Sequence, residues 1–141
     1  MINALICNSL LVAAAILIHY EMLYRLSNII QKLTIRHRFR VLFGLFGAML
    51  AHVTEIWLFA FGYYFMIKSG QFGSLSGNFN NSIMDCSYFS FTTYTSLGYG
   101  DVEPFGYIRF LAGLESLVGL VLIGWTASFM YIEMQKFWDR K

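Results

Sequence analysis

The sequence predicts an all-α membrane protein in which three helices span the bilayer. Of the 141 residues, 57% are hydrophobic and 13% are charged, whereas soluble domains carry about 25% charged residues. Three segments, residues 3–24, 41–67 and 106–134, are long and apolar enough to cross a membrane, which takes about 20 residues. Because the chain has one proline and no internal repeat or linker, we expect a single membrane unit.

The first of these segments, assigned to residues 1–24, is predicted to be a retained transmembrane helix. No Lys or Arg precedes Arg25 and no convincing cleavage site follows the apolar run, whereas a signal peptide begins with a positively charged region. The segment has no arginine ladder, so a voltage sensor of the usual type is not expected. His19, near its inner end, is expected to lie at the membrane interface.

A basic loop at residues 25–40 predicts the orientation of the chain. It contains no acid and carries Arg25, Lys32, Arg36, Arg38 and Arg40. Basic loops stay in the cytoplasm, and Lys136, Arg140 and Lys141 after the third span belong to the same side if the segment between the last two spans crosses only part-way. We therefore expect a plasma (inner) membrane protein with its N-terminus outside and its C-terminus in the cytoplasm. The loop is either a topology signal that touches anionic lipid or a regulatory lipid site.

The segment between the second and third spans is predicted to enter the membrane and return. Residues 68–82 are rich in Gly, Ser and Asn and are expected to form a mobile turret. Ser82 and Asp85 have the spacing of a capping box, which predicts a short helix at residues 83–94. Such a half-crossing helix directs the negative end of its dipole toward a central cavity, where a cation is stabilised.

The residues that follow, 95–101, read TSLGYGD and have the pattern of an ion pore. To strip water from a cation, successive carbonyl oxygens must point the same way, which requires the alternating dihedrals that Gly98 and Gly100 tolerate. Potassium filters use TVGYG for this purpose. Ser96 in place of Thr keeps a hydroxyl ligand, and Leu97 in place of Val keeps an apolar wall. A glycine-rich turn is an alternative, as is a phosphate loop, although the Lys and Ser/Thr of a phosphate loop are missing.

With these residues the chain resembles the pore module of tetrameric potassium channels, especially the small prokaryotic ones in which a pore loop lies between two transmembrane helices. The resemblance implies a pore domain at residues 41–141, divided into an outer helix 41–67, turret 68–82, pore helix 83–94, filter 95–101 and inner helix 106–134. It implies a homotetramer, because one filter strand lines only a quarter of the ion path. The N-terminal helix departs from the family pattern, and the resemblance supplies no role for it.

The resemblance also implies roles for individual residues. The backbone carbonyls of Ser96, Leu97, Gly98 and Tyr99, with the Ser96 hydroxyl, would bind potassium, and Gly100 would lie at the outer mouth. Thr95, Asp101 and Tyr88 would support the filter, with Tyr88 as the hydrogen-bond partner of Asp101. Gly119 falls where the family has a hinge glycine. A helical stripe would then face the cavity and gate, unless it serves ordinary helix packing: Leu120, Ile123, Ala127 and Tyr131.

Three ionisable residues inside the spans are candidates for function, because such groups are costly in a membrane. His52 and Glu55 lie three residues apart on one helical face, so they can pair with each other or with another helix. Glu115 is expected to brace the filter from behind, in place of a family carboxylate that is Thr92 here. Hydroxyls of Thr92, Thr93 or Tyr94 are its expected partners. Proton sensing and incidental polarity remain alternative roles for these groups.

The sequence contains no nucleophile triad, metal cluster or nucleic-acid motif, so neither an enzyme nor a nucleic-acid partner is expected, and no cofactor beyond potassium in the filter. Cys7 and Cys86 are expected to be free, although a disulfide is possible in an oxidising compartment. The predicted function is passive, potassium-selective conduction. The alternatives are a poorly selective cation channel and a non-conducting membrane subunit that keeps the pore fold.

Overall fold

The computed structural model describes residues 2–34 and 36–138 as a bundle of long helices with a small cap at one end. The elements are helix α1 (Ile2–Lys32), helix α2 (His37–Ser69), strand β1 (Gly73–Gly77), helix α3 (Ile83–Tyr94), strand β2 (Val102–Gly106) and helix α4 (Ile108–Trp138). The three long helices α1, α2 and α4 are each apolar and long enough to cross a membrane. The predicted all-α membrane fold is therefore confirmed.

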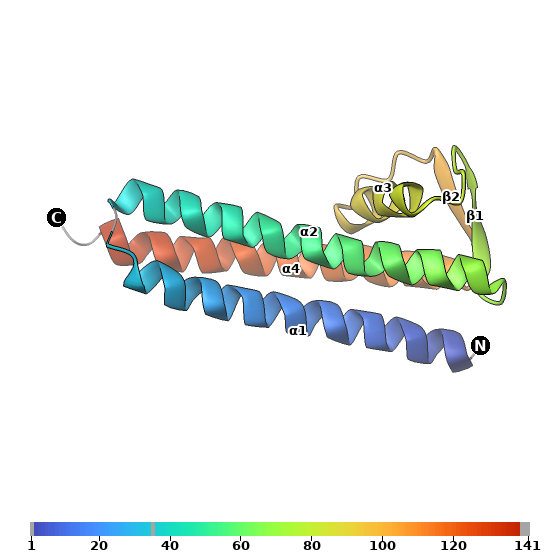
Figure 1. The fold of residues 1–141 in the computed structure, drawn as a ribbon, viewed down its shortest axis with the longest axis horizontal. Helices are drawn as coiled ribbons and strands as arrows, with labels where there is room; N and C mark the ends of the chain where they lie inside the picture. Colours follow the sequence, from blue (N-terminus) through green and yellow to red (C-terminus); the bar gives the residue numbers. More distant parts are fainter. Residues whose placement is uncertain (1, 35, 139–141) are drawn as a thin grey trace.

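The long helices run side by side, and the short elements gather at one end of them (Figure 1). Helix α3 lies against α2 and α4, next to the two strands. The N-terminus lies at the same end as the strands, and the C-terminus lies at the opposite end (Figure 1). The two ends of the bundle therefore differ in composition. One end holds the glycine-rich segments, and the other holds most of the basic residues.

The loop expected at residues 25–40 is mostly helical. Helix α1 continues to Lys32 and α2 begins at His37, so only residues 33–36 connect the two helices. The expectation rested on where the apolar run ends, but the sequence after Arg25 contains no glycine or proline and is rich in good helix formers. Arg25 is bonded to Glu21 one turn earlier, with 2.7 Å between Nε and the carboxylate.

The turret at residues 68–82 contains a paired strand instead of a wholly mobile loop. Strand β1 pairs antiparallel with β2, with Leu75 opposite Pro104, and the Leu75 side chain is buried. The amide of Tyr107 also donates to the carbonyl of Phe72 at 2.7 Å. The sequence of β1, GSLSG, has no β-branched residue to indicate a strand. Gly106 belongs to β2, so the inner helix begins two residues later than expected.

Helix α3 covers residues 83–94, and the capping box at its start is confirmed. The Ser82 hydroxyl accepts a hydrogen bond from the Asp85 amide at 3.0 Å, and the Asp85 carboxylate accepts from the Ser82 amide at 3.4 Å. The same carboxylate accepts from the amide of Asn80 at 2.9 Å. These bonds, led by the one from Asn80, lower the pKa of Asp85 below its usual 3.8. They fix the direction in which α3 leaves the cap.

We expect the Asp85→Asn variant to melt at a lower temperature than the wild type above about pH 4, because the amides of Asn80 and Ser82 stabilise the ionised carboxylate. Since the pKa of Asp85 is lower in the folded state, this stabilisation is present above the unfolded pKa and is lost as pH falls through the folded pKa. The difference in melting temperature should therefore vanish in strong acid. Ser82→Ala is the control, because the loss of its hydroxyl should lower the melting temperature at every pH. A deficit of Asp85→Asn that does not change with pH would contradict this account.

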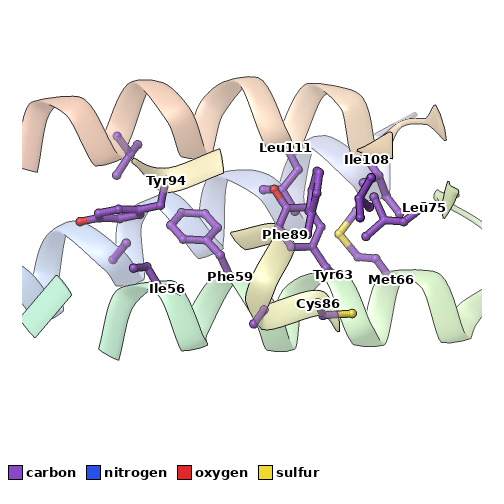
Figure 2. Close-up of a cluster of buried hydrophobic side chains, with 14 of the residues drawn as sticks. Ile56, Phe59, Tyr63, Met66, Leu75, Cys86, Phe89, Tyr94, Ile108 and Leu111 are labelled. Atoms are coloured by element: carbon purple, nitrogen blue, oxygen red, sulfur yellow. The ribbon is translucent and has the colours of Figure 1, made fainter. Parts of the chain in front are cut away.

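The main core lies between α2, α3 and α4 (Figure 2). Phe59 and Tyr63 of α2 meet Phe89 of α3 and Leu111 of α4 there, and the rings of Tyr63 and Phe89 pack edge to face at 5.0 Å. The oxygen of Tyr94 lies at the border of this core, on the side away from Phe59 (Figure 2). Its partners belong to a separate polar cluster described below.

Helix α1 packs closely along glycines of α2. A Cβ added at Gly47 would lie 2.5 Å from a methyl carbon of Leu26, and one added at Gly62 would lie 2.7 Å from a methyl carbon of Leu11. Small residues let membrane helices approach each other in this way. The N-terminal helix is therefore a packed part of the bundle.

Candidate ion-conduction site

The glycine-rich segment 95–101 emerges directly from the C-terminal end of α3. The amide of Ser96 donates to the carbonyl of Thr93 at 2.9 Å, and the amides of Leu97 and Gly98 both donate to the carbonyl of Thr92, at 2.9 and 3.0 Å. The carbonyls at the end of a helix have no partner within the helix, and here the segment supplies their partners. Helix and segment are thus hydrogen-bonded into one unit.

Every second residue of this segment has a left-handed backbone. Ser96 has φ +58°, Gly98 has φ +51° and Gly100 has φ +78°. Glycine adopts this region at little cost, whereas it is unusual for serine. The Ser96 hydroxyl lies 2.9 Å from the hydroxyl of Ser116 on α4, which holds the strained residue against the long helix. The segment therefore has the alternation that its sequence predicts.

The segment is exposed in the single chain. Residues 95–100 are all exposed, including the large side chains of Leu97 (57%) and Tyr99 (66%). The residues expected to line the cavity are exposed as well: Leu120, Ile123, Ala127 and Tyr131. One chain by itself leaves both surfaces uncovered.

The end of the segment is tied to α3 by the hydrogen bond expected from the sequence. The Tyr88 hydroxyl donates to the Asp101 carboxylate at 2.9 Å, and this bond to an acceptor raises the pKa of Tyr88. Thr95, at the other end, is exposed, and its hydroxyl donates to the carbonyl of Phe91 at 2.7 Å. Side chains therefore fasten both ends of the segment to α3.

Glu115 contacts α3, but through different partners from those expected. It is fully buried on α4, and its two oxygens accept hydrogen bonds from the hydroxyls of Tyr63 and Ser90, each at 2.5 Å. Two of the expected partners are engaged elsewhere, since Thr92 donates to the carbonyl of Phe89 and Tyr94 donates to Glu55. Ser90 lies in the middle of α3 and its hydroxyl points toward α4. Glu115 therefore contacts the middle of α3.

Gly119, for which a hinge role is expected, lies within an unbroken inner helix, and the hinge role stays a prediction. Helix α4 is continuous from Ile108 to Trp138, and Gly119 is buried against the last residue of α3. A Cβ at this position would lie 2.1 Å from the carbonyl oxygen of Tyr94. The glycine is needed for close approach of two backbones, whereas Gly113 and Gly124 on the same helix have nothing within 4 Å of such a Cβ.

A buried polar cluster joins all four helices next to the site. The Nδ1 atom of His19 on α1 lies 2.8 Å from one carboxylate oxygen of Glu55 on α2, and the Tyr94 hydroxyl donates to the other oxygen. The Nδ1 atom of His52 lies 2.9 Å from the Tyr94 hydroxyl and 3.4 Å from Glu55. The expected pairing of His52 with Glu55 is present. The expected interfacial place of His19 is wrong, because its side chain is fully buried.

This cluster is not evident in the sequence, because its members are far apart along the chain. His19 and Glu55 are separated by 36 residues, and no spacing rule relates residues on different helices. A polar residue on an otherwise apolar helix was the only available signal.

Among the cysteines, Cys7 and Cys86 are both free, as expected.

A comparison with known families identifies the chain at the level of family. The family model described as "Ion channel" matches residues 51–136, which is more than half of the chain. The match includes α3, the segment 95–101 and most of α2 and α4, whereas α1 lies outside it. Searches of curated proteins and of solved structures gave no match. The chain therefore belongs to this family of ion channels.

Proposed function

We propose that four copies of this chain form a potassium-selective channel that conducts passively across the membrane. The observation that carries the proposal is the segment 95–101, which leaves the end of α3 with a left-handed residue at every second position. Rings of backbone carbonyls from such segments replace the hydration shell of a potassium ion. The carbonyls of Ser96 to Tyr99 would provide the ion sites, and Gly100 would form the outer mouth.

The exposure of the site supports assembly into a tetramer. Large apolar side chains such as Leu97 and Tyr99 are exposed in one chain, and one segment can line only part of an ion path. Closed rotational symmetry about the segment would bring four copies together. The exposed stripe of Leu120, Ile123, Ala127 and Tyr131 would then line the cavity below.

The distribution of charge supports an orientation with the filter outside. The N-terminus lies at the end of the bundle that holds the strands (Figure 1), while Lys32, Arg36 and Lys136 lie toward the other end. By the positive-inside rule the basic end is cytoplasmic. Anionic lipid headgroups of the inner leaflet are the partners proposed for this end, through Arg25, Lys32, Arg36, Arg38 and Arg40.

One observation favours a poorly selective cation channel as the second candidate. The Ser96 hydroxyl, which would be the innermost ligand, lies within hydrogen-bond distance of Ser116. If that bond persists in the assembled channel, the hydroxyl is directed away from the ion. The inner end of the filter would then offer fewer ligands and discriminate less between cations.

The test is ion flux through the purified protein in liposomes, with potassium on one side and sodium on the other. The proposal predicts a reversal potential set by potassium, whereas equal permeability would select the second candidate. A tetramer without flux would instead identify a non-conducting subunit.

We expect Gly98→Ala to abolish potassium flux without preventing assembly. A Cβ at Gly98 meets nothing within 4 Å, so the change acts through the backbone, where an L-residue with φ +51° costs about 1–2 kcal/mol in each of four copies. Gly70→Ala is the matched control, because Gly70 has φ +69° and an equally open surrounding but lies at the end of α2. Wild-type flux in Gly98→Ala, or loss of flux in Gly70→Ala alone, would contradict the filter assignment.

A further inference from the structure

We propose that His19, His52 and Glu55 form a binding site for one divalent transition-metal ion, and that zinc is the ion that fits it. The ligand atoms of these three residues all lie within 4.8 Å of one another. They come from two helices, α1 and α2, that are packed closely along their length. The site is distinct from the proposed filter and does not depend on which ion the chain conducts.

The distances within the cluster suit a metal ion after small adjustments of the side chains. The Nδ1 atoms of His19 and His52 lie 2.8 and 3.4 Å from oxygens of Glu55. Zinc bonds of 2.0–2.2 Å in a tetrahedron separate neighbouring ligands by about 3.3 Å. The Tyr94 hydroxyl, 2.9 Å from the Nδ1 of His52, would be the fourth ligand, an oxygen.

The Nε2 atom of each imidazole, on the side away from Glu55, has a hydrogen-bond partner that would fix the orientation of the ring. The Nε2 atoms of His19 and His52 lie 3.3 and 3.0 Å from the same hydroxyl oxygen, that of Thr126 on α4. A hydroxyl oxygen has two lone pairs, so it can accept one N–H from each ring. With a metal ion bound, each neutral ring would carry its lone pair on Nδ1, the nitrogen on the side of Glu55. Zinc-binding histidines are oriented in this way, with the second ring nitrogen donating to an oxygen.

Burial makes a bound cation chemically reasonable at this place. His19 and Glu55 are fully buried, while the side chain of His52 is 16% exposed and gives the cluster one open edge. A buried carboxylate is costly without a compensating positive charge. Two imidazoles and a carboxylate are a ligand set that zinc prefers. One zinc ion would supply the charge and satisfy all three lone pairs.

Such an ion would fasten the N-terminal helix to the base of the proposed filter. His19 comes from α1, His52 and Glu55 from α2, Thr126 from α4, and Tyr94 is the last residue of α3. Tyr94 directly precedes the segment 95–101. The site would therefore give a role to α1, which lies outside the region matched by the ion channel family.

The experiment is a zinc titration of the full chain in detergent after removal of metal with a chelator, with bound metal measured after desalting. We expect one zinc ion per chain in the wild type and a loss of that ion in His19→Gln and in Glu55→Gln. Glu21→Gln is the matched control, since Glu21 is an exposed carboxylate of α1 that pairs with Arg25. It should bind zinc as the wild type does.

Two further measurements separate metal binding from folding. Thr126→Val removes only the acceptor behind the rings and should weaken zinc binding by about 10- to 100-fold without changing the number of ions bound at saturation. Cobalt added to the metal-free wild type should give the visible absorption of a four-coordinate ion, which needs no variant to fold. Absence of that absorption, or equal zinc in the wild type and Glu55→Gln, would overturn the proposal.

Discussion

Replacing Gly119 with alanine is expected to destabilise the chain strongly and to stop ion flux. The added Cβ would lie 2.1 Å from the carbonyl oxygen of Tyr94 and 3.0 Å from its ring, and backbone atoms cannot move away as a flexible side chain can. Overpacking of this kind costs about 1–3 kcal/mol and sometimes more. Because Tyr94 ends α3 and the segment 95–101 follows it, the displacement would act directly on the proposed filter.

The effect should appear in the melting temperature of the purified protein and in liposome flux. Gly113→Ala is the matched control on the same helix, since its Cβ would meet nothing within 4 Å. Alanine is the better helix former by about 0.8–1 kcal/mol, so this variant should be as stable as the wild type or more stable. If both variants melt at the wild-type temperature, α4 and α3 do not approach each other as closely as described.

Truncation of Glu115 to alanine is the second change with a large expected effect, whereas glutamine should be tolerated. Alanine removes the acceptor of the buried Tyr63 hydroxyl, which costs about 1–3 kcal/mol, and leaves a cavity whose cost is about 2–5 kcal/mol for comparable truncations. The sum is a sizeable part of the stability of a small protein. We expect Glu115→Ala to assemble poorly, or to conduct only briefly where it assembles.

Glutamine fits because of the hydrogens available at this site. Ser90 has one hydroxyl hydrogen but lies within hydrogen-bond distance of two acceptors, the carbonyl of Ile56 at 2.8 Å and Glu115 at 2.5 Å. The amide NH₂ of a glutamine can donate to the Ser90 oxygen, which leaves the serine hydrogen for Ile56. The amide oxygen can still accept from Tyr63. Glu115→Gln should therefore keep both the melting temperature and the flux, and a loss as large as that of alanine would show that the charge itself is required.

The features that the sequence predicted are those that depend on residues close together along the chain. The capping box at Ser82 and Asp85 depends on a spacing of three, and the left-handed backbone at residues 98 and 100 depends on the glycines there. The three spans follow from runs of apolar residues. The bond between Tyr88 and Asp101 was expected because the resemblance to potassium channels paired those two positions.

The features that were missed depend on contacts between distant elements. Nothing near Gly119 in the sequence indicates that the carbonyl of Tyr94 lies against it, and the hinge role expected for this glycine stays a prediction. The partner of Glu115 was misjudged because α3 presents several hydroxyls, and only packing selects Ser90. The strand in the turret is held by backbone bonds to residues 102–106, which leave no trace in side-chain pattern. The sequence around His19 gives no sign that its side chain contacts Glu55 of another helix.

The close packing of α1 on α2 affects how far this channel could be shortened from its N-terminus. The family match begins at residue 51, which invites the view that the first helix is an accessory to a self-sufficient pore. Removing it would open the grooves at Gly47 and Gly62 to acyl chains and would take His19 away from the carboxylate of Glu55, a charged group inside a membrane span, where charges are costly. The part of the chain that the family model matches is thus packed against a helix that lies outside the match.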